Sequence, residues 1–291
     1  MIRNSNTGSG YLSRLYVVVT FIVLFIPLQE VNAGRPLKII TYNVWQGYID
    51  GEHPRFPCYQ SGQKRKKEIY NWLKTENADV VVFQELIDYS AEKLQEESCF
   101  WGHHYATVLK DQGMTIGISS KYPIKVKELL TTGMHHGLVY CHIDGIDIIA
   151  THLWPRFDEK IVDEVNLVKQ RVNESLKKRV PVIVLGDFNA FSPQDDQYID
   201  STTIKLYRDR WNWKLENGRP SYRVIQELLG VGMKDVCIRF EKNRASRKLR
   251  YDFIFASSGL AEKCTDATFY QDEQFLKLSD HFPVTASFKI P

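Results

Sequence analysis

Acidic, amide and histidine side chains stand at the ends of short apolar segments in this sequence. Near the C-terminus, Asp280 and His281 come directly before a short apolar segment. Upstream, the apolar residues 182–185 lead to Asp187 and Asn189, which are two positions apart. Because residues i and i+2 of a strand point to the same face, Asp187 and Asn189 can reach one ligand together. The two segments indicate a hydrolytic site built on the ends of strands.

The same pattern recurs at four other positions. Asn43, Glu85 and His152 each follow an apolar segment, and Asp252 precedes one. A carboxylate at the edge of a core costs free energy unless it is paired or binds a cation. The set is rich in oxygen atoms and has no thiolate, which favours a hard cation such as Mg²⁺, Mn²⁺ or Ca²⁺ over zinc. With two histidines and no activated serine or cysteine, it predicts metal-dependent hydrolysis of a phosphoester, in which a general base activates water.

A series of strands and a few helices must position these residues. Apolar periodicity predicts strands over residues 37–44, 79–86, 104–109, 115–120, 124–130, 138–143, 147–153, 181–188, 250–256 and 284–288. It predicts helices over residues 63–77, 158–178 and 222–230, whereas residues 193–216 are partly helical at most. Several strands are apolar on both faces, as expected for strands that are covered on both sides. With no Pro/Gly/Ser linker, we expect one domain in which two sheets pack face to face with helices outside.

The N-terminal residues 1–33 are predicted to be a signal peptide. Arg3 and Arg14 precede an apolar run over residues 15–28, and small residues follow at Val31 and Ala33 with the spacing of a cleavage site. The run is shorter than the ~20 residues that a membrane span needs. We therefore expect export, to the periplasm or the medium, and a single domain over residues 34–291. A retained signal anchor is the alternative.

Composition limits the choice of partner. The net charge of +3 over 291 residues gives no global argument for nucleic acid binding. Two local basic stretches, residues 64–67 and 242–250, can follow a phosphate backbone. The second stretch directly precedes Asp252, so it is predicted to border the site.

The cysteines permit disulfides if the protein is exported. The five cysteines are an odd number, so at least one is unpaired within the chain. Cys141 lies in an apolar strand pattern and is expected to be a buried thiol. Cys58 could pair with Cys99, and Cys237 with Cys264.

Two pairs of adjacent histidines, His103-His104 and His135-His136, are assigned structural roles. Adjacent residues of a strand point to opposite faces, so neither pair is expected to present two rings to one ligand. We therefore expect the histidines of the site to be His152 and His281.

Six short stretches, taken together and in order, resemble the endonuclease/exonuclease/phosphatase superfamily, in the form of its secreted bacterial members. They are residues 41–45 (TYNVW), 84–86 (QEL), 151–153 (THL), 186–189 (GDFN), 250–254 (RYDFI) and 279–281 (SDH). The resemblance implies the DNase-I-like fold, a four-layer α/β sandwich of two packed mixed β-sheets flanked by helices.

The resemblance also implies a role for each matching residue. Glu85 would be the principal metal ligand, with Asn43 beside it, and Asp280 would touch a second metal or brace its loop. His281 would contact the scissile phosphate as general acid or base, and His152 would be its counterpart across the site.

The remaining roles concern water and substrate. Asp187 and Asn189 would bind or orient the attacking water and the phosphate, and Asp252 would accept the ring N–H of a histidine. The residues expected to bind substrate are Asn189, Trp154, Arg156 and Arg250.

The substrate stays open at this stage, because one fold serves many functions. Members of the superfamily cleave nucleic acids, inositol phosphates and sphingomyelin, and residues 151–159 have some likeness to sphingomyelinases. We expect a monomer with no obligate protein partner, acting on a phosphodiester or phosphomonoester of nucleic acid, a lipid headgroup or inositol. The alternative is a non-catalytic binding protein on the same fold, but retention of all the matching residues favours the enzyme.

Overall fold

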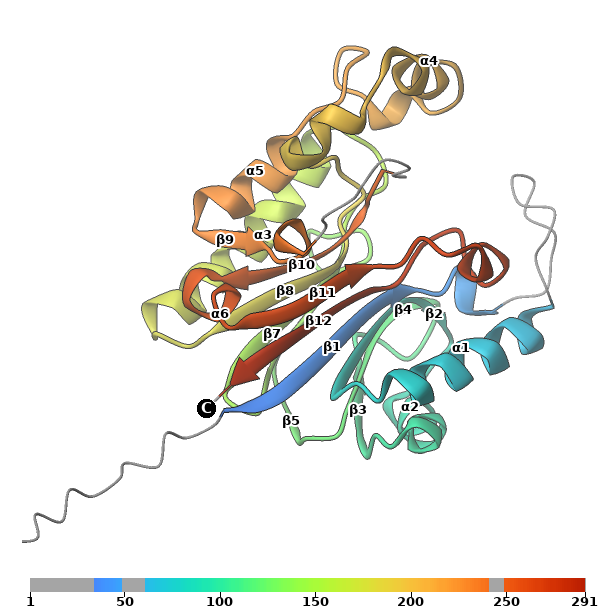
Figure 1. Cartoon of the computed structure of the whole chain (residues 1–291), viewed down its shortest axis with the longest axis vertical. Coiled ribbons are helices and arrows are strands. Elements are labelled where there is room, and N and C mark those ends of the chain that lie inside the picture. Colours follow the sequence, from blue (N-terminus) through green and yellow to red (C-terminus); the bar gives the residue numbers. More distant parts are fainter. Residues whose placement is uncertain (1–33, 49–60, 241–248, 291) are drawn as a thin grey trace, which may run out of the picture. The chain divides into compact units, whose positions relative to one another are not determined.

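Two six-stranded mixed sheets pack face to face, with helices on their outer faces (Figure 1). The predicted four-layer α/β sandwich is confirmed. The computed structural model describes residues 34–48, 61–240 and 249–290 of the chain. The predicted signal peptide over residues 1–33, Cys58 and residues 242–248 of the basic stretch lie outside the described residues.

The first sheet has the strand order β11-β12-β1-β2-β4-β3. Its strands are β1 (Arg35–Asn43), β2 (Val80–Ile87), β3 (Tyr105–Val108), β4 (Met114–Ser120), β11 (Cys264–Phe269) and β12 (Val284–Ile290). The pair β1 and β2 is parallel, and the other neighbours are antiparallel. Asn43 and Glu85 therefore lie at the same edge of this sheet.

The second sheet has the strand order β5-β6-β7-β8-β10-β9. Its strands are β5 (Ile124–Leu130), β6 (Leu138–Ile143), β7 (Ile146–His152), β8 (Val182–Asp187), β9 (Met233–Asp235) and β10 (Asp252–Ser257). Here β7 and β8 are the parallel pair. Each sheet thus contributes one parallel pair, whose carboxyl ends carry predicted site residues.

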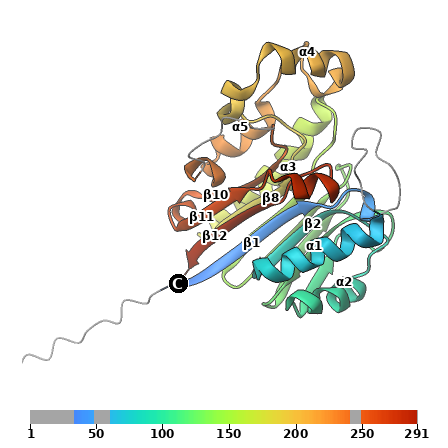
Figure 2. The ribbon, with the colours of Figure 1, turned by 45° about the vertical axis from the view of Figure 1, so that its right-hand side comes forward.

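Helices complete the two outer layers. Helices α1 (Gly62–Glu76) and α2 (Ala91–Ser98) cover the first sheet, and α3 (Glu159–Lys177) and α5 (Arg223–Gly230) cover the second (Figures 1 and 2). Helix α4 (Ser201–Arg210) lies outside the sandwich, and α6 (Ser258–Ala261) is a single turn after β10. The short 3-10 helices are η1 (Gln46–Tyr48), η2 (Cys99–Trp101), η3 (Pro193–Tyr198), η4 (Asn212–Lys214), η5 (Cys237–Arg239) and η6 (Glu273–Lys277). Among the described residues, no helix is both long and apolar enough to cross a membrane.

Alternating side chains of the central strands supply two hydrophobic cores. In β8, Ile183 and Leu185 belong to the core between the sheets, whereas Val182 and Val184 belong to the core beneath α3. Because strand side chains alternate between faces, a continuous apolar run serves both cores at once. Polar residues appear only where the strand leaves the cores, which is where Asp187 stands.

The predicted elements match the observed ones to within a few residues at each end. The helices α2 and α6 and the strands β9 and β11 were not predicted. The segment 193–216, expected to be partly helical at most, contains α4 together with η3 and η4. Helix α4 has no buried side chain, so it lacks the apolar stripe by which a packed helix is recognised in a sequence.

Candidate active site

Neighbouring strands of the second sheet bring three predicted site residues side by side. His152 at the end of β7 pairs with Asp187 at the end of β8, and Asp187 pairs with Asp252 at the start of β10. Gly186 has a φ of 138°, and a Cβ at this position would lie 1.9 Å from the carbonyl oxygen of Thr151. A side chain there would force the strands apart, so the glycine is needed to hold Asp187 in place.

The first sheet presents Glu85 through a backbone irregularity. The register between β2 and β4 shifts between Phe83 and Leu86, and Glu85 has a left-handed φ of 63°. A bulge of this kind re-aims a side chain, at a cost of about 1–3 kcal/mol for a residue other than glycine. The carboxylate accepts hydrogen bonds from Asn43 Nδ2 at 3.0 Å and from the backbone N–H of Gln46 at 2.8 Å. These two bonds hold Glu85 at the edge of the sheet, beside the residues of the second sheet.

Asp187 is the centre of the cluster. Its Oδ2 atom accepts a hydrogen bond from Asn43 Nδ2 at 3.1 Å, which joins the two sheets. The same oxygen lies 3.3 Å from His152 Nε2 and 3.6 Å from His281 Nε2. Its Oδ1 atom accepts the backbone N–H of Asn189 at 2.9 Å. One carboxylate therefore faces both predicted histidines.

The loop before β12 positions His281 through two hydrogen bonds. Its Nδ1 donates to Asp252 Oδ2 at 2.7 Å, and its backbone N–H donates to Ser279 Oγ, which itself donates to the carbonyl of Asn43. Burial opposes protonation of the ring, but the carboxylates of Asp252 and Asp187 outweigh it and raise the pKa of His281 well above its ordinary value. The two carboxylates thus favour the charged form of the ring, and Nε2 is directed at Asp187.

The surroundings of His152 favour the opposite protonation state. Its side chain is almost fully buried, and burial together with the positive charges of His281 and Lys214 lowers the pKa of His152 well below its ordinary value. The ring stacks on His136, with centroids 3.8 Å apart and an angle of 10° between the planes. Burial also lowers the pKa of His136 to about 2, so the stack contains two neutral rings.

The structural role assigned to the pair His135-His136 rested on a wrong premise. These residues lie in the turn between β5 and β6, so their rings are not forced to opposite faces of a strand. The two ring centroids are 4.2 Å apart, and His136 contacts His152 directly. The adjacent histidines His135 and His136 could have been noted in the sequence as candidate site residues. Only the position of the turn shows that the ring of His136 lies against His152.

Several buried polar atoms at the cluster have no hydrogen-bond partner among the described residues. They are His152 Nδ1, Asp252 Oδ1 and Asp280 Oδ1. A buried polar atom left unpaired is costly, so an atom of this kind at a cluster edge indicates a site for water, an ion or substrate. These unpaired atoms belong to residues that surround Asp187 and to the loop that carries His281.

The donor set fits a hard divalent cation. Burial raises the pKa of Glu85, against the opposing effect of its hydrogen bond from Asn43, and a cation beside the carboxylate would lower that pKa. Ligand atoms of Asp187, Asp252 and His281 also lie within 4.8 Å of one another. In that group, however, His281 and Asp252 already satisfy each other through a short N–H···O bond. Glu85 is therefore the better first ligand.

Lys214 is a site residue that the sequence did not reveal. Its ammonium group donates a hydrogen bond to Asn189 Oδ1 and lies 4.4 Å from the ring centroid of Tyr251. The residue comes from η4, in a segment whose sequence lacks a clear periodic pattern. Asn189 also donates from Nδ2 to the carbonyl of Leu153, so its amide is fixed between the lysine and the end of β7.

The predicted role of Arg250 in substrate binding is wrong. Its side chain is fully buried, where Nε donates to Asp195 Oδ2 at 2.9 Å and Nη2 donates to Asp235 Oδ2 at 2.6 Å. Arg250 precedes β10, and its guanidinium turns into the interior to meet these two carboxylates. The arginine thus supports the start of β10 and does not border the site.

The other two residues predicted to bind substrate lie after β7. Trp154 is half-buried, donates from Nε1 to Asp158 at 3.0 Å and has its ring centroid 4.4 Å from that of His135. It therefore reaches His152 only through the intervening histidines. Arg156 is exposed in the loop that leads to α3.

The cysteine predictions are partly corrected. Cys141 is a buried free thiol, as predicted. Cys264 is also a free thiol, so the proposed bridge between Cys237 and Cys264 is wrong. They lie in separate elements, Cys237 in η5 and Cys264 at the start of β11, where the thiol donates to the carbonyl of Asp266. Cys99 is an exposed free thiol, and its suggested partner Cys58 is outside the described residues.

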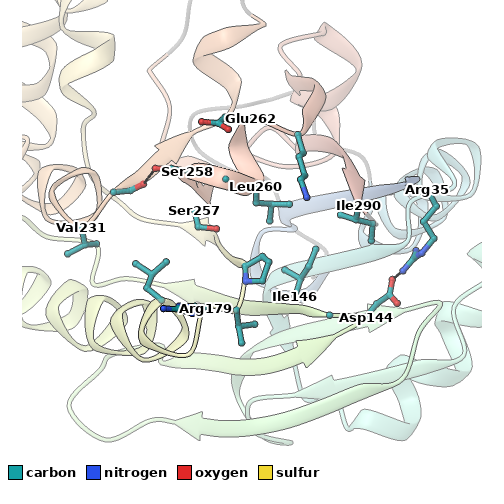
Figure 3. Close-up of a pocket in the computed structure, with 17 residues that line it drawn as sticks. Arg35, Asp144, Ile146, Arg179, Val231, Ser257, Ser258, Leu260, Glu262 and Ile290 are labelled. Atoms are coloured by element: carbon teal, nitrogen blue, oxygen red, sulfur yellow. Dashed lines mark hydrogen bonds and ion pairs between the residues drawn. The ribbon is translucent and has the colours of Figure 1, made fainter. Parts of the chain in front are cut away.

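One large cavity in the described part of the chain does not contain this cluster. It has a volume of about 1090 Å³ and is lined by Asp144, Ile146 and Arg179 on one side and by Ser257 and Leu260 on the other (Figure 3). These positions mark the opposite ends of β7, β8 and β10 from His152, Asp187 and Asp252. A smaller cavity of about 380 Å³ is lined by Asp252, Asp280 and His281. The chemistry of the residues, and not the size of the hollow, therefore locates the site.

Comparison with protein families accounts for this set of residues. The model of the Endonuclease/Exonuclease/phosphatase family matches residues 40–281. The chain belongs to this family. The match begins just before Asn43 and ends at His281, so it includes every residue of the cluster. No curated protein matches the chain in sequence comparison.

Solved structures share the fold at low sequence identity. The AP endonuclease from Archaeoglobus fulgidus is 21% identical with a TM-score of 0.57, over 87% of this chain and 100% of that one. A variant of the 3′ phosphatase NExo from Neisseria, bound to a product DNA hairpin, is 18% identical with a TM-score of 0.60, over 87% of this chain and 99% of that one. At these identities the similarity establishes the DNase-I-like fold, and function must come from the site.

Proposed function

We propose that the protein is a divalent-metal-dependent phosphoesterase that activates water by general acid–base catalysis. The observation that carries the proposal is geometric: Asp187 Oδ2 lies 3.3 Å from His152 Nε2 and 3.6 Å from His281 Nε2. Their surroundings raise the pKa of His281 and lower the pKa of His152, and such a separation is typical of active sites.

The geometry assigns a role to each group. His281, oriented by Asp252, contacts the phosphate and supplies the proton that the leaving oxygen needs. Asp187 accepts a proton from the attacking water, and His152 and Asn43 hold that carboxylate in place by their contacts with Oδ2. Asn189 and Lys214 bind the non-bridging oxygens of the phosphate, the lysine by its positive charge and the asparagine by its amide.

The residues that would hold the metal are Glu85 and Asn43, with Asp280 as a further carboxylate on the same side. When bound, a divalent cation neutralises the charge of the phosphate and polarises its P–O bonds. Whether or not a metal is bound, Asn43 orients the carboxylates of Glu85 and Asp187, because its Nδ2 donates a hydrogen bond to each.

The proposed substrate is a nucleic acid or a nucleotide. Two structural neighbours, an AP endonuclease and a 3′ phosphatase bound to product DNA, are named for nucleic acid chemistry, and this supports the choice over a lipid headgroup or an inositol phosphate. We further propose that the protein acts as a monomer, and that residues 1–33 direct its export and leave one domain over residues 34–291.

The test is an activity panel on the purified protein. We expect Mg²⁺- or Mn²⁺-dependent turnover of bis(p-nitrophenyl) phosphate that EDTA removes and added metal restores, and faster turnover of DNA than of sphingomyelin or inositol phosphates. The Glu85→Gln variant should need a much higher metal concentration for half-maximal activity. If no phosphoester is hydrolysed with any metal, the enzymatic function is excluded and a non-catalytic binding protein remains. Turnover in EDTA would exclude metal dependence.

A further inference from the structure

The smaller of the two cavities described above lies directly beside the proposed catalytic residues. It has a volume of about 380 Å³, and one wall consists of Asp252, Asp280 and His281. The remaining wall is dominated by aromatic side chains from distant parts of the sequence. These are Tyr198, Tyr207, Trp211, Tyr251, Phe269 and Phe282. The pocket therefore joins a phosphate-facing wall to an aromatic one.

The part of the aromatic wall beside α4 is built outside both hydrophobic cores. Tyr207 from α4 packs edge-to-face on Trp211 at 5.3 Å between centroids, and Phe191 packs on Tyr207 at 5.3 Å and on Tyr251 at 5.7 Å. The hydroxyl groups of Tyr207 and Tyr251 are hydrogen-bonded to each other. Helix α4 contributes no buried side chain, so the ring of Tyr207 does not belong to a hydrophobic core. The mutual contacts instead hold a fixed set of ring faces next to the site.

Electrostatic contacts tie this wall to the phosphate-binding side. Lys214 follows Trp211 in the same segment and bridges Asn189 and the ring of Tyr251. A phosphate held at Asn189 and Lys214 therefore lies next to Tyr251, and a group attached to that phosphate can enter the aromatic pocket.

We propose that this pocket binds the base of a nucleotide flanking the phosphate that is hydrolysed. The proposal rests on the phosphoesterase function and deepens it by naming the recognised group. Six of the lining residues are aromatic and three are leucines, which suits a planar ring more than an acyl chain. Every base offers a π-face, and stacking on an aromatic side chain contributes about 1–3 kcal/mol per base. A volume of about 380 Å³ accommodates a group of that size.

The test compares two tryptophans of one segment. Trp211 is half-buried in the pocket wall, whereas Trp213 is 41% exposed and does not line the pocket. Substrates are a short single-stranded DNA with all bases and two versions with an abasic spacer on one side of the scissile phosphate. We expect the wild type and Trp213→Ala to cleave the base-bearing strand at least ~10-fold faster, in kcat/KM, than one of the abasic versions. Trp211→Ala should lose that preference, so that the ratio of the two kcat/KM values falls to about 1.

A binding measurement separates this proposal from the catalytic one. Calorimetric titration with thymidine 5′-monophosphate and with deoxyribose 5-phosphate requires no turnover. We expect wild type and Trp213→Ala to bind the nucleotide more tightly, and Trp211→Ala and Trp211→Leu to bind the two compounds equally. Urea unfolding of all variants checks that the fold is retained.

Each contrary outcome overturns one proposal. Equal binding of the two compounds by the wild type refutes the base pocket, even if the protein is an active phosphoesterase. A selective loss of lysophosphatidylcholine hydrolysis in Trp211→Ala shows a lipid pocket instead. Tight, Trp211-dependent nucleotide binding without any turnover supports the pocket and refutes the catalytic function.

Discussion

Two buried charge clusters flank the start of β10, and they differ in their access to a cavity. Arg250 lies between Asp195 and Asp235, with its guanidinium bonded to both carboxylates. Two residues later, Asp252 belongs to a cluster of several carboxylates that has His281 as its cation. Both clusters contain a buried atom without a partner among the described residues: Arg250 Nη1 in the first, and Asp252 Oδ1 and Asp280 Oδ1 in the second. Only the carboxylates of the second cluster belong to residues that line a cavity, and Arg250 does not line it. Access to a cavity therefore distinguishes the second, candidate functional cluster from the first, structural cluster.

The largest effect is expected when the cation of the functional cluster is removed. His281→Ala should lower kcat on bis(p-nitrophenyl) phosphate by about 10²–10⁴-fold, the range of general acid–base catalysis, with a loss in the free energy of unfolding that leaves the protein folded. The matched control is His104→Ala, which removes an exposed histidine and should leave both quantities unchanged. Full activity in His281→Ala would remove the histidine from the mechanism, and global unfolding would place it with the structural cluster.

The reverse pattern is expected for the structural cluster. Arg250→Met leaves Asp195 and Asp235 buried without their cation, and breaking a buried ion pair in this way costs about 3–5 kcal/mol. Urea unfolding should show that loss, while kcat/KM per folded molecule at low temperature stays within ~3-fold of wild type. The exposed Arg210→Ala serves as control. A selective loss of substrate affinity in Arg250→Met would restore the substrate-binding role.

A second comparison contrasts two buried histidines, His103 and His152, and predicts how His103 makes the stability of the fold depend on pH. His103 has both ring nitrogens bonded, to Ser119 Oγ at 2.8 Å and to the carbonyl of Ala78 at 2.9 Å, whereas His152 Nδ1 has no partner among the described residues. Burial lowers the pKa of His103 to about 4. Because the unfolded chain takes up a proton near pH 6.5 and the folded chain does not, stability is complete above that pH and falls as the pH drops towards 4.

The magnitude follows from the difference between the two pKa values. His103 should account for up to about 3 kcal/mol of the loss in the free energy of unfolding between pH 6.5 and 4. The His103→Asn variant should have a smaller slope over that interval, and His104→Ala should keep the wild-type slope. Identical slopes for wild type and His103→Asn would show that His103 is protonated in the folded state.

The smallest effect is expected for the lysine at the rim of the functional cluster. Lys214→Ala should lower kcat/KM about 10-fold, because it removes a charge-assisted hydrogen bond to the phosphate of about 1.5–3 kcal/mol in a half-exposed position. Lys214→Arg should recover part of the loss, whereas the exposed Lys205→Ala on α4 should have none. An unchanged kcat/KM in Lys214→Ala would confine the lysine to holding Asn189.

The fold, and the polar residues that the structure brings together around Asp187, could be predicted because both follow from local patterns. Strands that run through two cores are apolar on both faces, so β2, β7 and β8 stand out in the sequence. The polar residues that end them, such as Asp187 and His152, mark where those cores stop. The short strand β9 has no such pattern and was not predicted, and the exposed helix α4 lies in a segment that was expected to be partly helical at most.

What the sequence determined by itself is the list of reactive groups and the kind of chemistry they allow. Only the tertiary structure decided which of these groups lie in contact with one another. It buried Arg250 against two distant carboxylates, turned His136 onto His152, and brought Lys214 to Asn189. The physical reason is that strand periodicity fixes side-chain direction locally, whereas loops and exposed helices take their direction from partners far away in the chain.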